Sequence, residues 1–114
     1  MKTMSIVLPA YNEEQMIGKT ARTIAQLMEK ENISYELVFV NDGSKDLTWE
    51  RIMEVSKKDP NVKGICFSRN FGKEGAVFAG LANASGDCVA VMDCDLQHPP
   101  ETLVTMYLLL SLKP

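Results

Sequence analysis

The sequence has no excess of positive charge, because its 12 Lys and Arg residues are outnumbered by 15 Asp and Glu residues. Nucleic-acid binding through a broad basic face needs the opposite balance, so we expect no nucleic-acid partner. Cysteine is scarce as well, with three residues in 114, and no signal-peptide pattern precedes Pro9. An odd number of thiols without a leader fits reduced cysteines and a cytoplasmic location better than a disulfide scaffold.

Long hydrophobic runs are missing too. The apolar run at residues 103–112 is too short to span a membrane, which takes about 20 residues in a helix. The phosphate-loop pattern Gly-x-x-x-x-Gly-Lys-Ser/Thr and a Gly-x-Gly-x-x-Gly after the first strand are both absent, so NTPase and dinucleotide oxidoreductase interpretations lose their main support. With 46% hydrophobic and 24% charged residues, residues 1–114 are expected to form one compact unit.

Apolar segments rich in β-forming residues alternate with segments of helical periodicity. The predicted strands are residues 5–8, 35–40, 62–67 and 88–92, and the predicted helices are residues 13–30, 46–57, 73–84 and about 100–112. Asn12 is expected to cap the first helix, with two glutamates in its first turn. The alternation predicts an α/β fold with a Rossmann-like, mainly parallel sheet and helices on both faces. The continuous apolar run at 88–92 predicts a strand covered on both faces.

Polar residues follow each predicted strand. In a parallel sheet the carboxyl ends of the strands meet at one edge, and ligands bind beyond that edge. The segments expected there are residues 9–13, 41–44, 68–73 and 93–98. The sequence therefore predicts a ligand site on one rim of the sheet.

Two acidic residues, Asp93 and Asp95, follow the fourth predicted strand, and Gln97 comes two residues later. Side chains two apart in an extended chain point the same way, so all three can present oxygens to one place. Oxygen ligands suit Mg²⁺ or Mn²⁺ bound together with substrate phosphates. An EF-hand loop is excluded because His98 and Val104 stand where it needs Gly and Glu. A solvated acidic turn is the alternative.

The other rim residues each allow two interpretations. Asp42 either accepts hydrogen bonds from a base or ribose, or forms a plain turn with the glycine that follows it. Tyr11 and Glu13 either contact a nucleoside, or serve as a packed ring and a carboxylate matched to a helix dipole. Arg69 and Lys73 precede or begin a helix, where they either meet a diphosphate or anionic acceptor, or remain solvated.

Together these segments resemble the family 2 glycosyltransferases of the GT-A fold. The resemblance rests on residues 6–14 (Ile-Val-Leu-Pro-Ala-Tyr-Asn-Glu-Glu), 40–44 (Val-Asn-Asp-Gly-Ser) and 93–101 (Asp-Cys-Asp-Leu-Gln-His-Pro-Pro-Glu). With residues 68–74 (Ser-Arg-Asn-Phe-Gly-Lys-Glu), the chain is most similar to the polyprenyl-phosphate sugar transferases, which include dolichol-phosphate mannose synthase and the bactoprenol glucosyltransferases. The resemblance covers residues 4 to about 102 and implies the nucleotide-binding half of a GT-A fold.

The resemblance also implies roles for individual residues. Those implied for the nucleoside of a UDP- or GDP-sugar are Pro9, Tyr11, Glu13, Val40 and Asp42, with Asp95 and the backbone of Cys94 also against the nucleotide. Asp93, Asp95 and Gln97 are implied to hold Mg²⁺ or Mn²⁺ on the diphosphate. The implied acceptor is a polyprenyl phosphate, undecaprenyl or dolichyl, at the cytoplasmic face of a membrane, glycosylated with inversion. No catalytic base is assigned, because a phosphate monoester with a second pKa near 6 is already largely ionised at pH 7.

Relatives in this group continue with further strands, an acceptor region and, in many, membrane helices. We therefore expect a donor half, truncated at its C-terminus, whose membrane contact lies in parts absent from this chain. Exposed leucines at positions 108, 109, 110 and 112 are expected to promote self-association. Two alternatives stay open: a non-catalytic nucleotide-binding fragment, and a phosphatase or phosphotransferase with an aspartate nucleophile. The second is less expected, because such enzymes usually carry Asp-x-Asp on the first strand.

Overall fold

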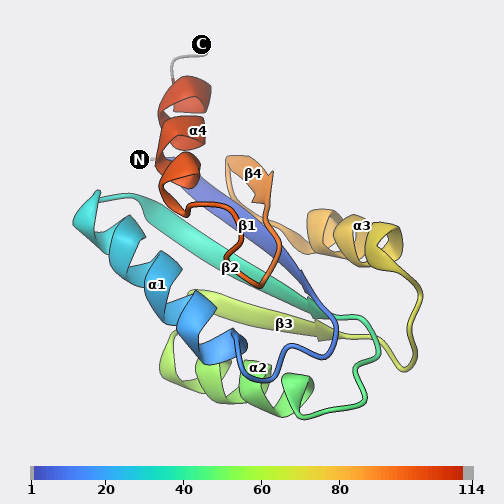
Figure 1. Cartoon of the computed structure of the whole chain (residues 1–114). Helices are drawn as coiled ribbons and strands as arrows, with labels where there is room; N and C mark the ends of the chain where they lie inside the picture. The colour runs from blue at the N-terminus through green and yellow to red at the C-terminus, as the bar shows by residue number, and fades with distance from the viewer. Residues whose placement is uncertain (1, 112–114) are drawn as a thin grey trace.

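The computed structural model describes residues 2–111, in which strands and helices alternate along the chain (Figure 1). The elements are β1 (Thr3–Ala10), α1 (Ile17–Lys30), β2 (Ser34–Asn41), α2 (Thr48–Lys58), β3 (Val62–Cys66), α3 (Lys73–Asn83), β4 (Cys88–Val91) and α4 (Glu101–Ser111). The strands form one sheet in the order β3-β2-β1-β4, and each neighbouring pair is parallel. The predicted α/β fold with a parallel sheet is confirmed.

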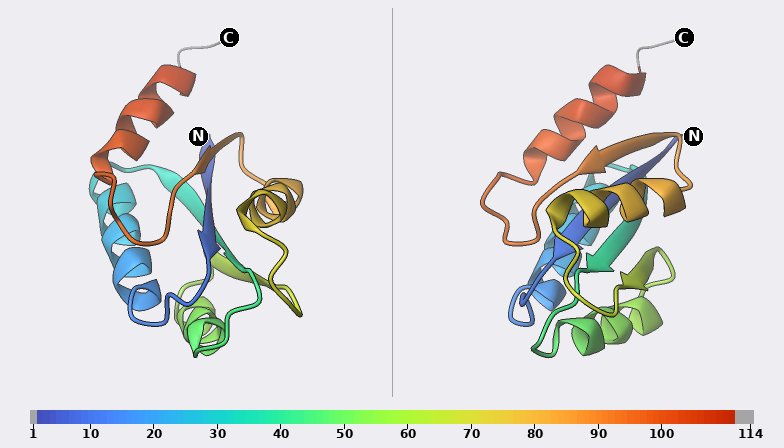
Figure 2. Two further views of the ribbon diagram at one scale, coloured as in Figure 1. Left: turned by 45° about the vertical axis from the view of Figure 1, so that its right-hand side comes forward. Right: turned by 90° about the vertical axis from the view of Figure 1, so that its right-hand side faces the viewer.

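Side chains that alternate along β1 and β2 build a core on each face of the sheet. Ile6 and Phe39 face one side, where they join residues of α1, α2 and α4 in one buried cluster. Val7 and Val40 face the other side, where Ala76 of α3 packs on them. Helices therefore cover both faces, as predicted, with α3 opposite α1 and α2 (Figure 2).

The helix α3 lies unusually close to the sheet because it presents small residues to it. A Cβ placed on Gly80 would overlap the Cγ1 atom of Val7, a fully buried side chain of β1. Any larger residue at position 80 must push α3 away from the sheet. This close approach sets the position of the whole helix, whose first residue is Lys73.

The start of α1 differs from the prediction. The helix begins at Ile17, its cap position is Met16, and no acidic residue lies in its first turn. Asn12 does not cap it: Asn12 has a φ of 53°, its backbone N–H donates to the Ser44 hydroxyl at 2.9 Å, and its side-chain oxygen accepts from the Lys45 N–H at 2.9 Å. The prediction was wrong because the side chain of Asn12 is used to join two loops.

The strand β4 is also shorter and more open than predicted. It ends at Val91, pairs with β1 at the edge of the sheet, and leaves Val91 44% exposed. The prediction of a strand covered on both faces was wrong: α3 packs mainly over β1 and β2, and β4 joins that cluster only through the partly buried Val89.

The last helix, α4, leads away from the sheet (Figure 1). Leu108 and Leu109 are exposed as predicted and Leu110 is half-buried, whereas Leu112 lies outside the described residues. The self-association expected from them stays a prediction. Within residues 2–111, every helix is too short or too polar to cross a membrane.

Candidate functional site

The four predicted segments do meet at one rim of the sheet. Backbone hydrogen bonds extend the parallel pairing past the strands: the Asp42 N–H donates to the Ala10 carbonyl at 2.9 Å, and the Phe67 N–H donates to the Asn41 carbonyl at 2.9 Å. On the other side of β1, the Met92 N–H donates to the Val7 carbonyl at 3.0 Å. Because these bonds continue the sheet into the loops, the loops after all four strands are held side by side.

Two adjoining cavities open on this rim. The first, of about 140 Å³, is lined by predicted site residues from β1, from α3 and from the loops after β1, β2 and β4, together with Ala10. These predicted residues are Pro9, Tyr11, Asp42, Lys73 and Asp93. The second, of about 260 Å³, shares Lys73 and Asp93 with the first and extends past His98 to α4. The structure thus places five of the eleven predicted site residues around one space.

An ion pair stands where the two cavities adjoin. The ammonium nitrogen of Lys73 lies 2.7 Å from a carboxylate oxygen of Asp93, and both side chains are partly exposed. Lys73 begins α3 and Asp93 follows β4, so the pair joins α3 to the loop after β4. Lys73 thereby brings a positive charge directly to the acidic motif.

The chain after β4 was expected to run extended, but it does not. Residues 94 and 95 form a turn, Leu96 has a φ of 60°, and the Gln97 N–H donates to the Asp95 carboxylate at 3.1 Å. The prediction that the side chains of Asp93, Asp95 and Gln97 point the same way in an extended chain is therefore wrong. The ligand roles of Asp93, Asp95 and Gln97 stay predictions.

The negative charge at the rim contributes to a shift in the ionisation of Glu13. Partial burial raises the pKa of Glu13 above its ordinary value, and the nearby carboxylates of Asp95, Asp46 and Asp93 raise it further. A divalent cation in this field would relieve the repulsion between the carboxylates.

The oxygen ligands at the rim fit a metal ion bound partly by the protein and partly by a substrate better than one bound by protein side chains alone. Among the described residues, no group of three or more His, Cys, Asp or Glu side chains is arranged to hold a metal ion. Mg²⁺ usually takes one or two protein carboxylates and completes its shell with water and substrate phosphates. Asp93 and Asp95 can supply those carboxylates, so the site fits a cation that arrives with a phosphorylated ligand.

Asp42 is buried in the rim and bound to a neighbouring loop. It is only 4% exposed, and its two carboxylate oxygens accept the backbone N–H groups of Phe71 at 2.8 Å and Gly72 at 3.1 Å. Gly43 has a φ of 67°, and a Cβ there would overlap the backbone of Arg69 and Asn70. The turn after β2 and the loop before α3 are therefore packed against each other without a gap.

The predicted residues that line neither cavity are Glu13, Val40, Arg69, Cys94, Asp95 and Gln97. The side chain of Val40 is fully buried beneath α3. Cys94 is also buried: burial raises the pKa of its thiol to about 12, and its carbonyl accepts the Thr20 hydroxyl at 2.6 Å. The guanidinium of Arg69 lies over the ring of Phe71, 4.6 Å from its centroid, and lines neither cavity.

Sequence reasoning missed the contacts that hold the first rim loop. The Glu13 N–H donates to the Thr48 hydroxyl at 2.7 Å, and the Glu14 N–H donates to the Asp46 carboxylate at 3.3 Å. Asp46 also accepts the Thr48 N–H at 3.0 Å. The signal for this was an acidic residue two positions before a threonine at a helix start, a pattern that satisfies backbone N–H groups.

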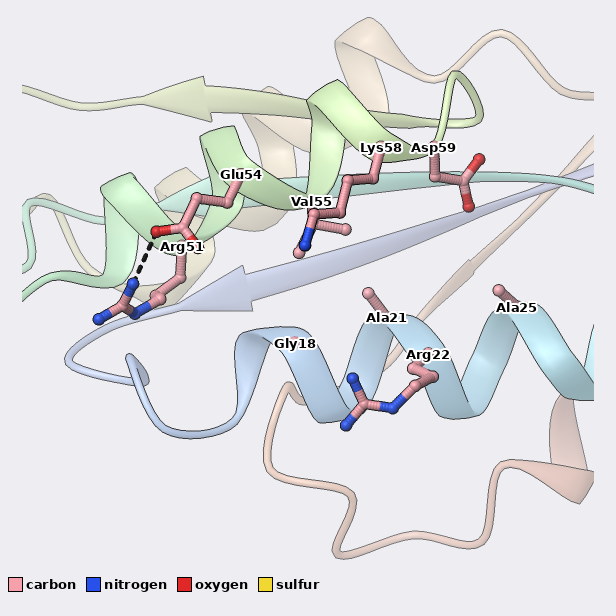
Figure 3. A pocket seen from close by; sticks show the side chains of 9 residues that line it. All are labelled: Gly18, Ala21, Arg22, Ala25, Arg51, Glu54, Val55, Lys58 and Asp59. Carbon is pink, nitrogen blue, oxygen red and sulfur yellow. Dashed lines mark hydrogen bonds and ion pairs between the residues drawn. The ribbon is translucent and has the colours of Figure 1, made fainter.

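A further groove, of about 290 Å³, lies between α1 and α2 and holds none of the predicted site residues (Figure 3). Its charged side chains are of both signs, and Arg51 pairs with Glu54 at 2.6 Å. The groove is separate from the rim, so it forms no part of the candidate site.

Comparison with known proteins identifies the family to which this fold and rim belong. The sequence model described as Glycosyl transferase family 2 matches residues 5–111. The bactoprenol glucosyl transferase of Shigella phage SfV is 46% identical over 100 residues, which are 88% of this chain and 33% of that protein. The chain thus spans about a third of the length of this curated relative.

Solved structures share the fold. The mannosyltransferase PcManGT from Pyrobaculum calidifontis, in complex with GDP-Man and Mn²⁺, superimposes with a TM-score of 0.72 and 25% identity over 90% of this chain and 30% of that one. S. aureus TarS in complex with UDP gives a TM-score of 0.75 and 28% identity over 97% of this chain and 32% of that one.

Proposed function

The chain belongs to glycosyl transferase family 2. From this premise we propose that it forms the donor-binding part of an enzyme that transfers a sugar from a UDP-sugar or GDP-sugar to a polyprenyl phosphate. The observation that carries the proposal is the rim cavity lined by Tyr11, Asp42, Lys73 and Asp93. It is supported by the nucleotides in the PcManGT and TarS structures and by the similarity to a bactoprenol glucosyl transferase.

The nucleoside is proposed to lie at the β1 side of the cavity. Tyr11 is 43% exposed there, so its ring offers a face on which a base can stack. Pro9 lines the same cavity, and Glu13, in the loop that follows β1, is proposed to accept a hydrogen bond from a ribose hydroxyl. Val40 and Cys94 are buried, so any contact they make with the nucleotide is through the backbone.

The diphosphate is proposed to lie toward Lys73 and Asp93. Asp93 and Asp95, with Gln97, are the residues proposed to hold Mg²⁺ or Mn²⁺, which when bound neutralises the charge that develops on the leaving nucleoside diphosphate. Lys73 supplies a positive charge from the chain itself. Arg69, which lies in the loop before Lys73 and lines neither cavity, is proposed for the acceptor side.

The transfer needs alignment more than proton removal. An acceptor phosphate oxygen attacks the anomeric carbon while the bond from that carbon to the nucleoside diphosphate breaks, and the leaving group takes the electron pair. Because attack and departure are in line, the anomeric configuration inverts. The acceptor phosphate already carries negative charge at pH 7, so no general base is required. The lipid places the reaction at the cytoplasmic face of a membrane.

The proposal is tested by an NMR titration of the chain with UDP and with GDP, each with and without Mg²⁺. One of the two nucleotides should shift the amides around Tyr11 and Lys73, and Mg²⁺ should tighten its binding. Asp95→Asn should remove most of the Mg²⁺ effect, whereas Glu54→Gln, in the groove between α1 and α2, should leave it intact. A folded sample that responds to neither nucleotide would overturn the proposal. The non-catalytic alternative predicts the same binding but no sugar transfer when the remaining two-thirds of a relative is supplied.

A further inference from the structure

We infer that Thr20 is a positioning residue for the acidic motif at residues 93–95, because its hydroxyl holds the peptide group that joins Cys94 to Asp95. Thr20 lies on α1 and lines neither rim cavity. This role rests on the proposed function, in which Asp93 and Asp95 hold Mg²⁺ or Mn²⁺ on the diphosphate. It leaves the nucleoside contacts proposed at the turn after β2 as they are.

Thr20 is a polar residue on an otherwise apolar buried face of α1. It is fully buried, and the buried residues of this helix are Ile17, Thr20, Ala21, Ile24 and Met28. A threonine inside a helix often bonds to the carbonyl one turn earlier, but the Thr20 hydroxyl donates to the distant Cys94 carbonyl at 2.6 Å. Because a buried hydroxyl without a partner is costly, this bond fixes the direction in which the hydroxyl points.

Cys94, the middle residue of the acidic motif, receives this bond inside the core. It is 1% exposed and belongs to the buried cluster that also contains Ile17 of α1 and Leu103 of α4. Its side chain therefore anchors the motif to the core, while Thr20 supplies the partner that its buried carbonyl needs. The two flanking carboxylates are thus carried by a residue that α1 holds through both packing and a hydrogen bond.

Holding the Cys94 carbonyl also sets the direction of Asp95. A peptide group is planar, so the carbonyl oxygen of Cys94 and the nitrogen and Cα atoms of Asp95 lie in one plane. Beyond this plane the chain turns: Leu96 has a φ of 60°, and the Gln97 N–H donates to the Asp95 carboxylate at 3.1 Å. The Thr20 hydroxyl therefore holds the start of the turn that presents the Asp95 carboxylate.

Asp93, the other carboxylate of the motif, is held by separate contacts. Its carboxylate pairs with Lys73 at 2.7 Å, and the N–H of the preceding Met92 donates to the Val7 carbonyl at 3.0 Å. Neither contact involves α1. Loss of the Thr20 hydroxyl should therefore displace the Asp95 carboxylate and leave Asp93 in place. The effect should appear in the part of nucleotide binding that depends on the metal, because residues that orient a metal ligand influence metal affinity.

The test compares wild type with Thr20→Val, Thr20→Ser and the control Thr23→Val. Valine replaces the hydroxyl with a methyl group, serine keeps the hydroxyl and loses the methyl group, and Thr23 is a half-buried residue of the same helix. NMR titrations of folded samples give the affinities for UDP and GDP with and without Mg²⁺. In Thr20→Val the gain in affinity caused by Mg²⁺ should fall about tenfold, while the affinity without Mg²⁺ should change by less than about twofold. Thr20→Ser and Thr23→Val should behave as wild type.

Three results would overturn the inference. Equal losses of affinity with and without Mg²⁺ in Thr20→Val would show a general loss of structure in place of a positioning role. A loss in Thr20→Ser as large as in Thr20→Val would show that packing of the methyl group matters and the hydroxyl does not. An unchanged effect of Mg²⁺ in Thr20→Val would show that the Asp95 carboxylate is held without Thr20.

Measurements without nucleotide separate this inference from the proposed function. In Thr20→Val the carbonyl ¹³C signal of Cys94 and the amide signal of Gln97 should shift, and Mn²⁺ alone should broaden the signals of residues 93–97 less than in wild type. If these changes occur but neither nucleotide binds wild type, the proposed function fails while the positioning role of Thr20 stands. If wild type binds a nucleotide but the Cys94 and Gln97 signals are unchanged in Thr20→Val, the inference is wrong and the proposed function stands.

Discussion

The carboxylate of Glu36 offers a sharp test of what holds the sheet together. It lies on β2 and accepts four hydrogen bonds from three other parts of the chain: the Ser5 hydroxyl at 2.8 Å, the Ser85 N–H at 3.0 Å, the Ser85 hydroxyl at 2.8 Å and the Lys63 ammonium at 3.0 Å. These partners belong to β1, to the loop before β4 and to β3. We predict that Glu36→Gln destabilises the protein substantially near neutral pH.

The magnitude follows from the ionisation of this group. Burial alone would raise the pKa of Glu36, but the hydrogen bonds from Ser85, Ser5 and Lys63 outweigh it and lower the pKa from 4.5 to about 2. At 1.36 kcal/mol for each pKa unit, this difference corresponds to about 3 kcal/mol of stability. Because the side chain is only 16% exposed, solvent screens it little.

The sign of the pH dependence is fixed by the direction of the shift. A carboxyl with a lowered pKa in the folded state stabilises that state fully above its unfolded pKa, here near 4.5, and loses the contribution as the pH falls toward 2. Urea unfolding between pH 7 and pH 2 should therefore show a steeper acid loss for wild type than for Glu36→Gln. The difference between the two curves should reach about 3 kcal/mol.

The matched control is Glu54→Gln, which removes an exposed carboxylate paired with Arg51 on the same helix. Exposed pairs of this kind contribute less than about 1 kcal/mol, so this variant should follow the acid dependence of wild type. The reasoning is refuted if wild type and Glu36→Gln lose stability in parallel below pH 5. A directly measured Glu36 pKa near 4.5 would refute it equally.

Three further predictions concern the sheet, α3 and the metal. Burial, and after it the hydrogen bond to Asp59, raises the pKa of Tyr35 to about 12. The neutral phenol therefore stabilises the folded state up to about pH 10, and this stabilisation is lost as the pH rises toward 12. Tyr35→Phe should make the stability less dependent on pH between these two values, as measured by unfolding at alkaline pH. Gly75→Ala should raise the melting temperature through a gain of about 0.5–1 kcal/mol in helix propensity, since its Cβ would make ordinary contact. Gly80→Ala should lower it, because overpacking against Val7 costs about 1–3 kcal/mol; equal effects of the two substitutions in thermal scans would contradict this account of how α3 packs. Mn²⁺ should broaden the amide signals of residues 93–97 in the presence of the nucleotide that binds, and Asp95→Asn should abolish that broadening.

The order of elements and the location of the rim could be predicted from the sequence because both depend on local patterns. The apolar stripe of Ile17, Ala21, Ile24 and Met28 repeats at helical spacing and is buried as expected. Turn-forming residues after each apolar run marked the places where strands end. Parallel pairing then requires those ends to lie together, whatever the details of each loop.

The details of the rim could not be predicted, because they depend on contacts between residues far apart in the chain. From the sequence alone Asn12 is predicted to cap a helix. The pairing of β1 with β2 instead brings Ser44 and Lys45 beside it, and it bonds to them. Asp42 reads as an open acceptor, and no local pattern shows that the N–H groups of Phe71 and Gly72 face it.

Two carboxylates, Glu36 in β2 and Asp42 directly after it, together explain how α3 is held. Asp42 binds the backbone at the entry to α3, through Phe71 and Gly72, and Glu36 binds the backbone beyond its exit, through Ser85. The helix itself buries few residues, chiefly Ala76 and Gly80, so these two attachments matter for its position. Because the attachments lie at opposite ends, their effects can be separated by hydrogen exchange.

We expect Glu36→Gln to release the amide of Ser85 while the amides of Phe71 and Gly72 stay protected, and Asp42→Asn to do the reverse. The loss of acid-sensitive stability should follow Glu36→Gln alone. A Glu36→Gln variant that stays folded but also releases the amides of Phe71 and Gly72 would show instead that α3 moves as one rigid body.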